Sequence, residues 1–181
     1  RLPWLIILLG LGLVVSSVVG LFEGVVAQLT IVICFQSLIL DMAGNVGTQS
    51  LAVTIRVLMD ESLTGKQKLQ LVFKEMRIGF CNGLLLGVLS FAVIGLFIFL
   101  FKGKTMMFAF SVSACIGIAL LLAMLISSAV GTCIPLFFKK IHIDPAVASG
   151  PLITTVNDLV AVVTFYGLSW LFLIEMLHLA G

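Results

Sequence analysis

Five long apolar segments alternate with short polar connections along this chain. A membrane-spanning helix needs about 20 mostly apolar residues, and every segment reaches that length. The segments are residues 2–22, 25–58, 69–101, 106–134 and 151–177. The pattern predicts an all-α integral membrane protein in which residues 1–181 form a single transmembrane domain of five helices. The second and third segments exceed the bilayer thickness, so we expect them to tilt, kink or extend into the cytoplasm.

Basic residues gather in alternate connections. Five spans place the two termini on opposite sides of the membrane, and Lys102 and Lys104 fall on one side. The other side holds Arg1, Arg56, Lys66, Lys68, Lys74, Arg77, Lys139 and Lys140. Because cytoplasmic loops are enriched in Lys and Arg, we expect a multi-pass protein of the inner (plasma) membrane with a cytoplasmic N-terminus and an external C-terminus.

The composition supports a membrane protein and excludes several classes. Of the 181 residues, 61% are hydrophobic and 10% are charged, with a mean hydropathy of +1.31, outside the range of soluble domains. No basic stripe with interleaved aromatic residues is present, so nucleic acid is not an expected partner. The chain opens with Arg-Leu-Pro-Trp instead of methionine, and we expect a soluble part to precede Arg1 in a longer protein.

Cysteines and small residues are interpreted as packing features. The cysteines lie in apolar runs without metal-ligand spacing, which indicates neither a zinc site nor a disulfide framework. They are Cys34, Cys81, Cys115 and Cys133. Small residues at four-residue spacing, which let helices approach closely in lipid, are Gly12, Ser16, Gly20, Gly79, Gly83 and Gly87. They fit packing inside one bundle or contact between subunits.

Two carboxylates, Asp41 and Asp158, lie deep in apolar sequence with no Lys or Arg at a comparable depth. Intramembrane acids are rare and mark ion or proton pathways. Asp158 shares a helix face with Pro151, Thr154 and Thr155. If Pro151 begins the last helix, Asp158 lies roughly 10 Å along it, a depth that suits a permeation site. A structural acid satisfied by hydrogen bonds is the alternative.

A second polar stripe runs along the helix that contains Asp41. Its members are Ser37, Asp41, Gly44, Asn45, Thr48 and Ala52, with Gln49 at its margin. Gly44 and Gly47 mark an expected irregularity of this helix. A polar stripe in lipid must face protein or water, so we expect it to line the same path as Asp158. Alternatively, Asp41 is a buried acid that its polar neighbours satisfy.

The candidate ligands are all oxygen atoms, which hard cations prefer. A single carboxylate per chain is a poor cage for a dehydrated calcium ion. Two carboxylates related by a dimer axis suit a hydrated Mg²⁺, which loses its water reluctantly. Magnesium is therefore the favoured transported ion, and Mn²⁺, Co²⁺ and Ni²⁺ remain open.

Two motifs resemble those of the MgtE-type magnesium transporters. The segment Asp41-Met-Ala-Gly-Asn-Val-Gly-Thr-Gln49 is similar to the glycine-rich second-helix motif of that family. The segment Asp144-Pro-Ala-Val-Ala-Ser-Gly-Pro151, followed by Thr154-Thr-Val-Asn-Asp158, looks like the entry into its last helix. The opening Arg-Leu-Pro-Trp and the Gly-Leu-Phe-Glu23 end of the first helix also fit. The resemblance covers essentially the whole chain.

The resemblance implies a homodimer with an ion path on its two-fold axis, lined mainly by the second and fifth helices. Asp158 then corresponds to the pore aspartate, the backbone carbonyl of Thr154 helps to bind hydrated Mg²⁺, and Asp144 lies at the cytoplasmic mouth. Relatives carry a cytosolic regulatory region with paired CBS modules, which this sequence does not include, so we expect that form of regulation to be missing.

Three positions depart from the family pattern. The chain has Ala43 and Ala161 where the family often has glycine, and Gln36 near the place of a family proline. Each difference removes a backbone irregularity or a small contact. They therefore bear on pore geometry, gating and selectivity, and none alters the carboxylate of Asp158.

Other functions stay open at this point. A proton- or sodium-coupled carrier of a small solute would use Asp158 as its coupling group, and a membrane anchor or sensor would not need that carboxylate. An enzyme is not expected, because His142 and His178 have no nucleophile or acid arranged around them. His142 beside Asp144 is either part of a cation-attracting mouth or a solvated loop histidine. Glu23 and Glu175 either attract cations or are ordinary interfacial acids.

Overall fold

Helices account for nearly all of the computed structural model, which describes residues 2–28, 30–59 and 63–176. The elements are α1 (Leu2–Leu21), α2 (Glu23–Gln28), α3 (Thr30–Leu58), α4 (Gly65–Phe101), α5 (Met106–Lys140), α6 (Pro145–Leu168) and a terminal π-helix, η1 (Ser169–Met176). Five helical stretches are long and apolar enough to cross a membrane. The prediction of a five-helix, multi-pass membrane protein is therefore confirmed.

Local sequence signals move several helix boundaries away from the predicted ones. α4 begins at Gly65, because Thr64 and Gln67 form a capping box in which the Thr64 backbone N–H donates to Gln67 Oε1 at 2.8 Å. α5 continues past Pro135 to Lys140. The second predicted segment is divided between α2 and α3. The predicted end of the last segment, at residue 177, lies outside the described residues.

The last helix begins at Pro145, so the predicted start at Pro151 is wrong. Asp144 is the N-cap, and its Oδ1 accepts a hydrogen bond from the Ala146 backbone N–H at 2.9 Å. Asp-Pro is a strong start signal, since aspartate caps the free N–H groups and proline suits the first helical turn. Asp158 therefore lies roughly 20 Å from the start of α6, at 1.5 Å per residue, instead of the roughly 10 Å predicted.

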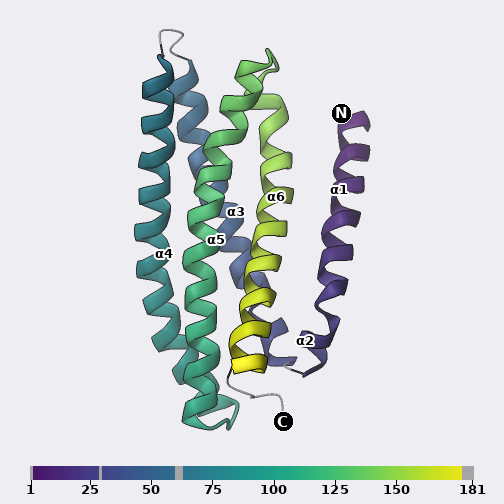
Figure 1. The fold of residues 1–181 in the computed structure, drawn as a ribbon, viewed down its shortest axis with the longest axis vertical. Helices are drawn as coiled ribbons and strands as arrows, with labels where there is room; N and C mark the ends of the chain where they lie inside the picture. The colour runs from purple at the N-terminus through teal and green to yellow at the C-terminus, as the bar shows by residue number, and fades with distance from the viewer. Residues whose placement is uncertain (1, 29, 60–62, 177–181) are drawn as a thin grey trace.

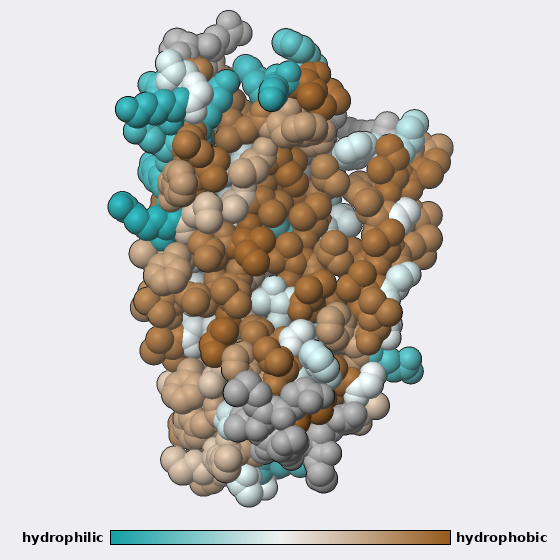
Figure 2. Space-filling model, in the orientation of Figure 1, coloured by the Kyte–Doolittle hydropathy of each residue, from teal (hydrophilic) through white to brown (hydrophobic). Residues whose placement is uncertain are grey.

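α5 forms the centre of the bundle and packs against α4, α3 and α6 (Figure 1). α1 stands to one side, where it contacts α6 and α2 and has no buried residue of its own. Apolar side chains cover the middle of the face seen in Figure 2, while hydrophilic side chains gather at the end where α3 ends and α4 begins. That distribution is expected of a bundle surrounded by lipid.

The glycines of α4 explain its close contact with α5. A Cβ built on Gly87 would lie 2.8 Å from the Gly117 carbonyl oxygen, and one on Gly83 would lie 2.9 Å from Leu121 Cα. The ridge on α4 therefore serves packing inside the chain, which settles one of the two alternatives. A Cβ on Gly12 or Gly20 in α1 would meet nothing within 4 Å. Within this chain, the α1 ridge has no such contact.

Only one cysteine is a buried packing residue. Cys115 is 3% exposed, and its Sγ lies 3.7 Å from Ser169 Oγ. Cys34, Cys81 and Cys133 are exposed on the outside of the bundle, and all four thiols are free. The interpretation of the cysteines as packing residues is wrong for these three, because their helix faces are turned away from the rest of the chain.

Candidate functional site

An open groove of about 310 Å³ lies between α3 and α6 and brings together most of the predicted pore residues. Its lining consists of Leu40, Asp41, Gly44, Asn45, Thr48, Thr154 and Asp158. The α3 members follow one another at intervals of three and four residues, which places them on one face of that helix. Neither Lys nor Arg is among the lining residues, so the groove offers carboxylate, amide and hydroxyl oxygens without a competing cation.

The two acids have different surroundings. Asp41 is exposed at the groove wall, as is Asn45 one turn further along α3, whereas Asp158 is half-buried. Thr48 donates its hydroxyl hydrogen to the backbone, 3.0 Å from both Gly44 O and Asn45 O. Its oxygen keeps lone pairs that face the groove. The α3 wall therefore presents acceptors, which suit a cation or its water ligands.

Pro151 organises the α6 wall without lining the groove. Its carbonyl oxygen accepts the Thr154 hydroxyl at 2.8 Å and the Thr155 hydroxyl at 3.0 Å. These bonds turn both hydroxyl hydrogens back towards the helix. In an α-helix the Thr154 carbonyl accepts the N–H of residue 158, which leaves one lone pair free for a further ligand.

The remaining predicted residues lie beside the groove or beyond it. Gln49 is exposed on α3 and Thr155 is half-buried on α6, and neither lines the groove. Asp144 is exposed at the N-cap of α6. His142, next to it, is exposed and has a positive φ of 60°. Glu23 is the exposed first residue of α2, while the side chain of Glu175 lies outside the described ones.

A contact of three helices behind the groove fixes its walls, and sequence reasoning gave these residues no role. Asn157 is 0% exposed, and its Nδ2 donates to the Ala43 carbonyl at 3.3 Å. Gly47 has no room for a side chain, because a Cβ there would overlap Asn157 and lie 3.2 Å from Ile153 Cγ2. A Cβ on Gly131 of α5 would overlap the Gly47 carbonyl. α3, α5 and α6 therefore meet at Gly47.

Two departures from the family pattern lie in this packing. Gln36 Oε1 accepts a hydrogen bond from the Tyr166 hydroxyl, which joins α3 to α6 beyond the groove. Tyr166 also stacks on Phe22, with ring centroids 5.7 Å apart. Ala43 and Ala161 are both fully buried. The glutamine thus supplies a cross-helix contact that a proline side chain lacks.

A third acid in the helical core is Glu75, which the sequence analysis missed. It is 4% exposed, and its Oε2 accepts a hydrogen bond from Ser50 Oγ at 2.9 Å. The sequence analysis assigned this part of the chain to a cytoplasmic connection. Because α4 begins at Gly65, Glu75 belongs to the packed part of that helix instead. The four-residue spacing to the ridge glycine Gly79 was the available signal.

Comparison with known proteins agrees with this arrangement. The family model described as "Divalent cation transporter", MgtE, matches residues 36–168. The magnesium transporter MgtE of Bacillus subtilis is 36% identical over 173 residues, and that of Enterococcus faecalis is 35% identical over the same length. The protein of that name from Thermus thermophilus is 30% identical. Each alignment covers 96% of this chain and 36% of the relative, so the chain spans about a third of their length.

The match includes both walls of the groove, since residues 36–168 contain α3 from Gln36 onwards and the whole of α6. It also includes Gly47, Gly131 and Asn157, which hold the two walls together. On the extent of the family match and the identity to these relatives, the chain belongs to the MgtE family.

Proposed function

We propose that this chain conducts divalent cations, with Mg²⁺ as the principal substrate, along the groove between α3 and α6. The observation that carries the proposal is the convergence of Asp41, Asn45 and Asp158 on one open groove without a basic side chain. Intramembrane carboxylates without a basic partner mark ion pathways. The printed name of the relatives, magnesium transporter, supports Mg²⁺ as the ion.

A second copy of the chain completes the pathway in this proposal. The groove opens on the surface of the bundle, and among the described residues no group of three His, Cys, Asp or Glu side chains could hold a metal ion. Two copies facing each other across a two-fold axis bring two Asp158 carboxylates to one site. A pair of carboxylates neutralises a divalent charge, and the ion keeps most of its water shell.

Each residue of the site has a defined role. Asp158 attracts the hydrated ion, and the free lone pair of the Thr154 carbonyl accepts hydrogen bonds from its water ligands. Asp41, Asn45 and Thr48 provide further acceptors along the opposite wall. Asp144 lies at the cytoplasmic mouth, where the carboxylate concentrates cations. The role of Gly44 is to keep the groove wide.

The proposed orientation places the N-terminus in the cytoplasm and the C-terminus outside. Arg56, the last-turn basic residue of α3, and Lys139 and Lys140 at the end of α5 share one end of the bundle with the beginning of α4 (Figure 1). Lys102 and Lys104 lie in the connection at the opposite end. The excess of positive charge marks the cytoplasmic end under the positive-inside rule.

Uptake of Mg²⁺ into proteoliposomes tests the proposed function. The wild-type protein is compared with Asp158→Asn, which preserves shape and removes the charge, at equal dimer content by size exclusion. We expect uptake that follows the Mg²⁺ gradient without an imposed proton or sodium gradient, and its loss in the variant. Uptake of another solute that depends on a proton or sodium gradient would instead support the coupled carrier.

A further inference from the structure

The seam between α4 and α5 carries a row of depressions that share no residue with the α3–α6 groove. At one end, Lys74, Arg77, Phe80 and Leu125 are among the residues that line a partly polar depression. The next depression, of about 300 Å³, is almost entirely apolar and is lined by residues that include Gly83, Gly87, Gly117 and Leu121. A third depression shares Phe91, Ala114 and Ile118 with the second.

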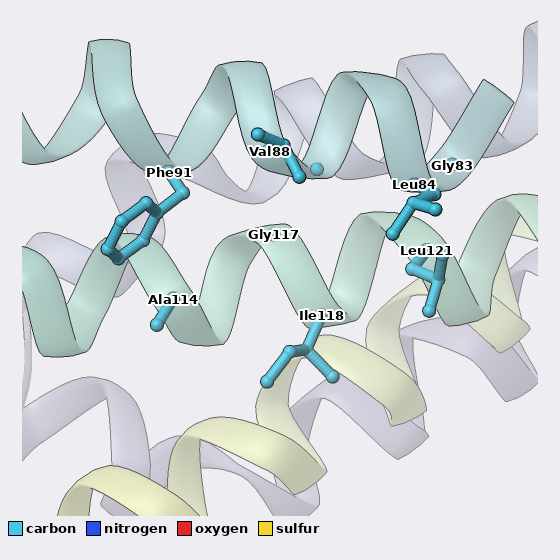
Figure 3. A pocket seen from close by; sticks show the side chains of 9 residues that line it. Gly83, Leu84, Val88, Phe91, Ala114, Gly117, Ile118 and Leu121 are labelled. Carbon is cyan, nitrogen blue, oxygen red and sulfur yellow. The ribbon is translucent and has the colours of Figure 1, made fainter. Parts of the chain in front are cut away.

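Close approach of the two helices creates the apolar part of the seam. Gly87 and Gly117 leave their backbones in contact, so no side chain fills the space above them. Figure 3 shows Leu84, Val88 and Phe91 along the α4 wall of this depression. Ala114, Ile118 and Leu121 line the α5 wall. The result is an open trough in the lipid-facing surface with hydrocarbon walls.

The basic depression adjoins the apolar one. Phe80 and Leu84 are four residues apart on α4, and Leu121 and Leu125 are four residues apart on α5, so each pair lies on one helix face. Lys74 and Arg77 are exposed and three residues apart on the same helix. A cationic pocket therefore leads into a hydrocarbon trough. This sequence of surfaces matches a phospholipid, with its phosphate at one end and its acyl chain at the other.

The distances agree with the dimensions of one membrane leaflet. Ten residues separate Arg77 from Gly87, which is roughly 15 Å along α4. Half of the hydrocarbon core of a bilayer is also about 15 Å. A lipid whose headgroup contacts Arg77 therefore reaches the Gly87–Gly117 contact with the end of its acyl chain.

We propose that the α4–α5 seam is a binding site for an anionic phospholipid. Lys74 and Arg77 bind the headgroup phosphate, and one acyl chain occupies the trough over Gly83, Gly87 and Gly117. Basic pockets between membrane helices select anionic headgroups in this way. The site is separate from the groove that holds Asp158, so its occupancy and the path of the cation are measured independently.

Native mass spectrometry tests the headgroup half of the site. The protein is equilibrated with equal amounts of phosphatidylglycerol and phosphatidylcholine of identical acyl chains, and the retained lipids are counted. We expect phosphatidylglycerol to be retained roughly tenfold or more over phosphatidylcholine, since each basic residue contributes about a fivefold preference. The double variant Lys74→Gln/Arg77→Gln should lose that preference. The matched control Lys66→Gln/Lys140→Gln, which alters exposed residues at the same end, should keep it.

A second pair of variants tests the acyl-chain half. Ala114→Phe fills the trough from the α5 wall, while Val93→Phe adds the same ring to an exposed position of α4 away from the trough. We expect Ala114→Phe to lower retention of both lipids severalfold and Val93→Phe to have no effect. Size exclusion confirms that each variant is folded. Equal retention of the two lipids by the wild type, or unchanged retention in the Lys74/Arg77 or Ala114 variants, would overturn the proposal.

Discussion

The Asn157 side chain donates a hydrogen bond to the Ala43 carbonyl, 3.3 Å away, and so joins α6 to α3 directly behind Asp158. Adjacent residues of a helix point in different directions. Asn157 is therefore buried against α3 while Asp158 faces the groove. The buried amide holds the wall that carries the acid.

Asn157→Ala should weaken both the fold and transport. The change removes the hydrogen bond and leaves a small cavity beside Gly47, so we expect a loss of roughly 1–2 kcal/mol of stability and reduced Mg²⁺ uptake. Thermal unfolding in detergent and proteoliposome uptake measure the two effects. Asn82→Ala, at an exposed position of α4, is the matched control. Wild-type stability and uptake in Asn157→Ala would show that this contact does not hold the groove.

Gly47→Ala and Gly44→Ala should differ in stability although the two glycines are three residues apart. A methyl group at Gly47 overlaps Asn157 and approaches Ile153, whereas one at Gly44 meets nothing within 4 Å. Overpacking of this kind costs roughly 1–3 kcal/mol. We expect a lowered melting temperature for Gly47→Ala and an unchanged or slightly raised one for Gly44→Ala. Equal melting temperatures would contradict the three-helix contact at Gly47.

Glu75 should be a packing residue whose charge transport does not need. Glu75→Gln keeps an oxygen that accepts the Ser50 hydroxyl, so we expect near-wild-type stability and Mg²⁺ uptake. Glu75→Leu leaves Ser50 without its partner and should cost roughly 1–3 kcal/mol. Unfolding measurements and uptake per folded protein separate these effects. Loss of uptake in a stable Glu75→Gln protein would instead give this carboxylate a part in ion movement.

Much of the fold follows from local sequence. Five spans are predictable because each depends only on a run of apolar residues. The start of the last helix was predicted wrongly because Pro151 was given more weight than the Asp144-Pro145 pair. In lipid, a proline inside a helix is tolerated when neighbouring groups satisfy the freed backbone. The polar faces of α3 and α6 were also predictable, from helical spacing alone.

The packing between helices was not predictable from that spacing. Hydropathy does not specify which turn of α3 lies against which turn of α6. Gly47, Gly131 and Asn157 determine this register through backbone contacts, and single glycines carry no sign of their partner. Glu75 was missed for a related reason, since its burial depends on Ser50, which belongs to another helix.

Block of transport by Cd²⁺ at an introduced cysteine tests the central claim most directly. Thr154→Cys lines the groove and leaves the backbone carbonyl in place, and the four native cysteines are replaced by alanine. If cations pass along the α3–α6 groove between two copies of the chain, micromolar Cd²⁺ should bind the paired thiols and stop Mg²⁺ uptake. Val163→Cys, exposed on α6 but outside the groove, should remain insensitive. Unimpaired Mg²⁺ uptake by the Cd²⁺-treated Thr154→Cys protein would show that the ions take another path.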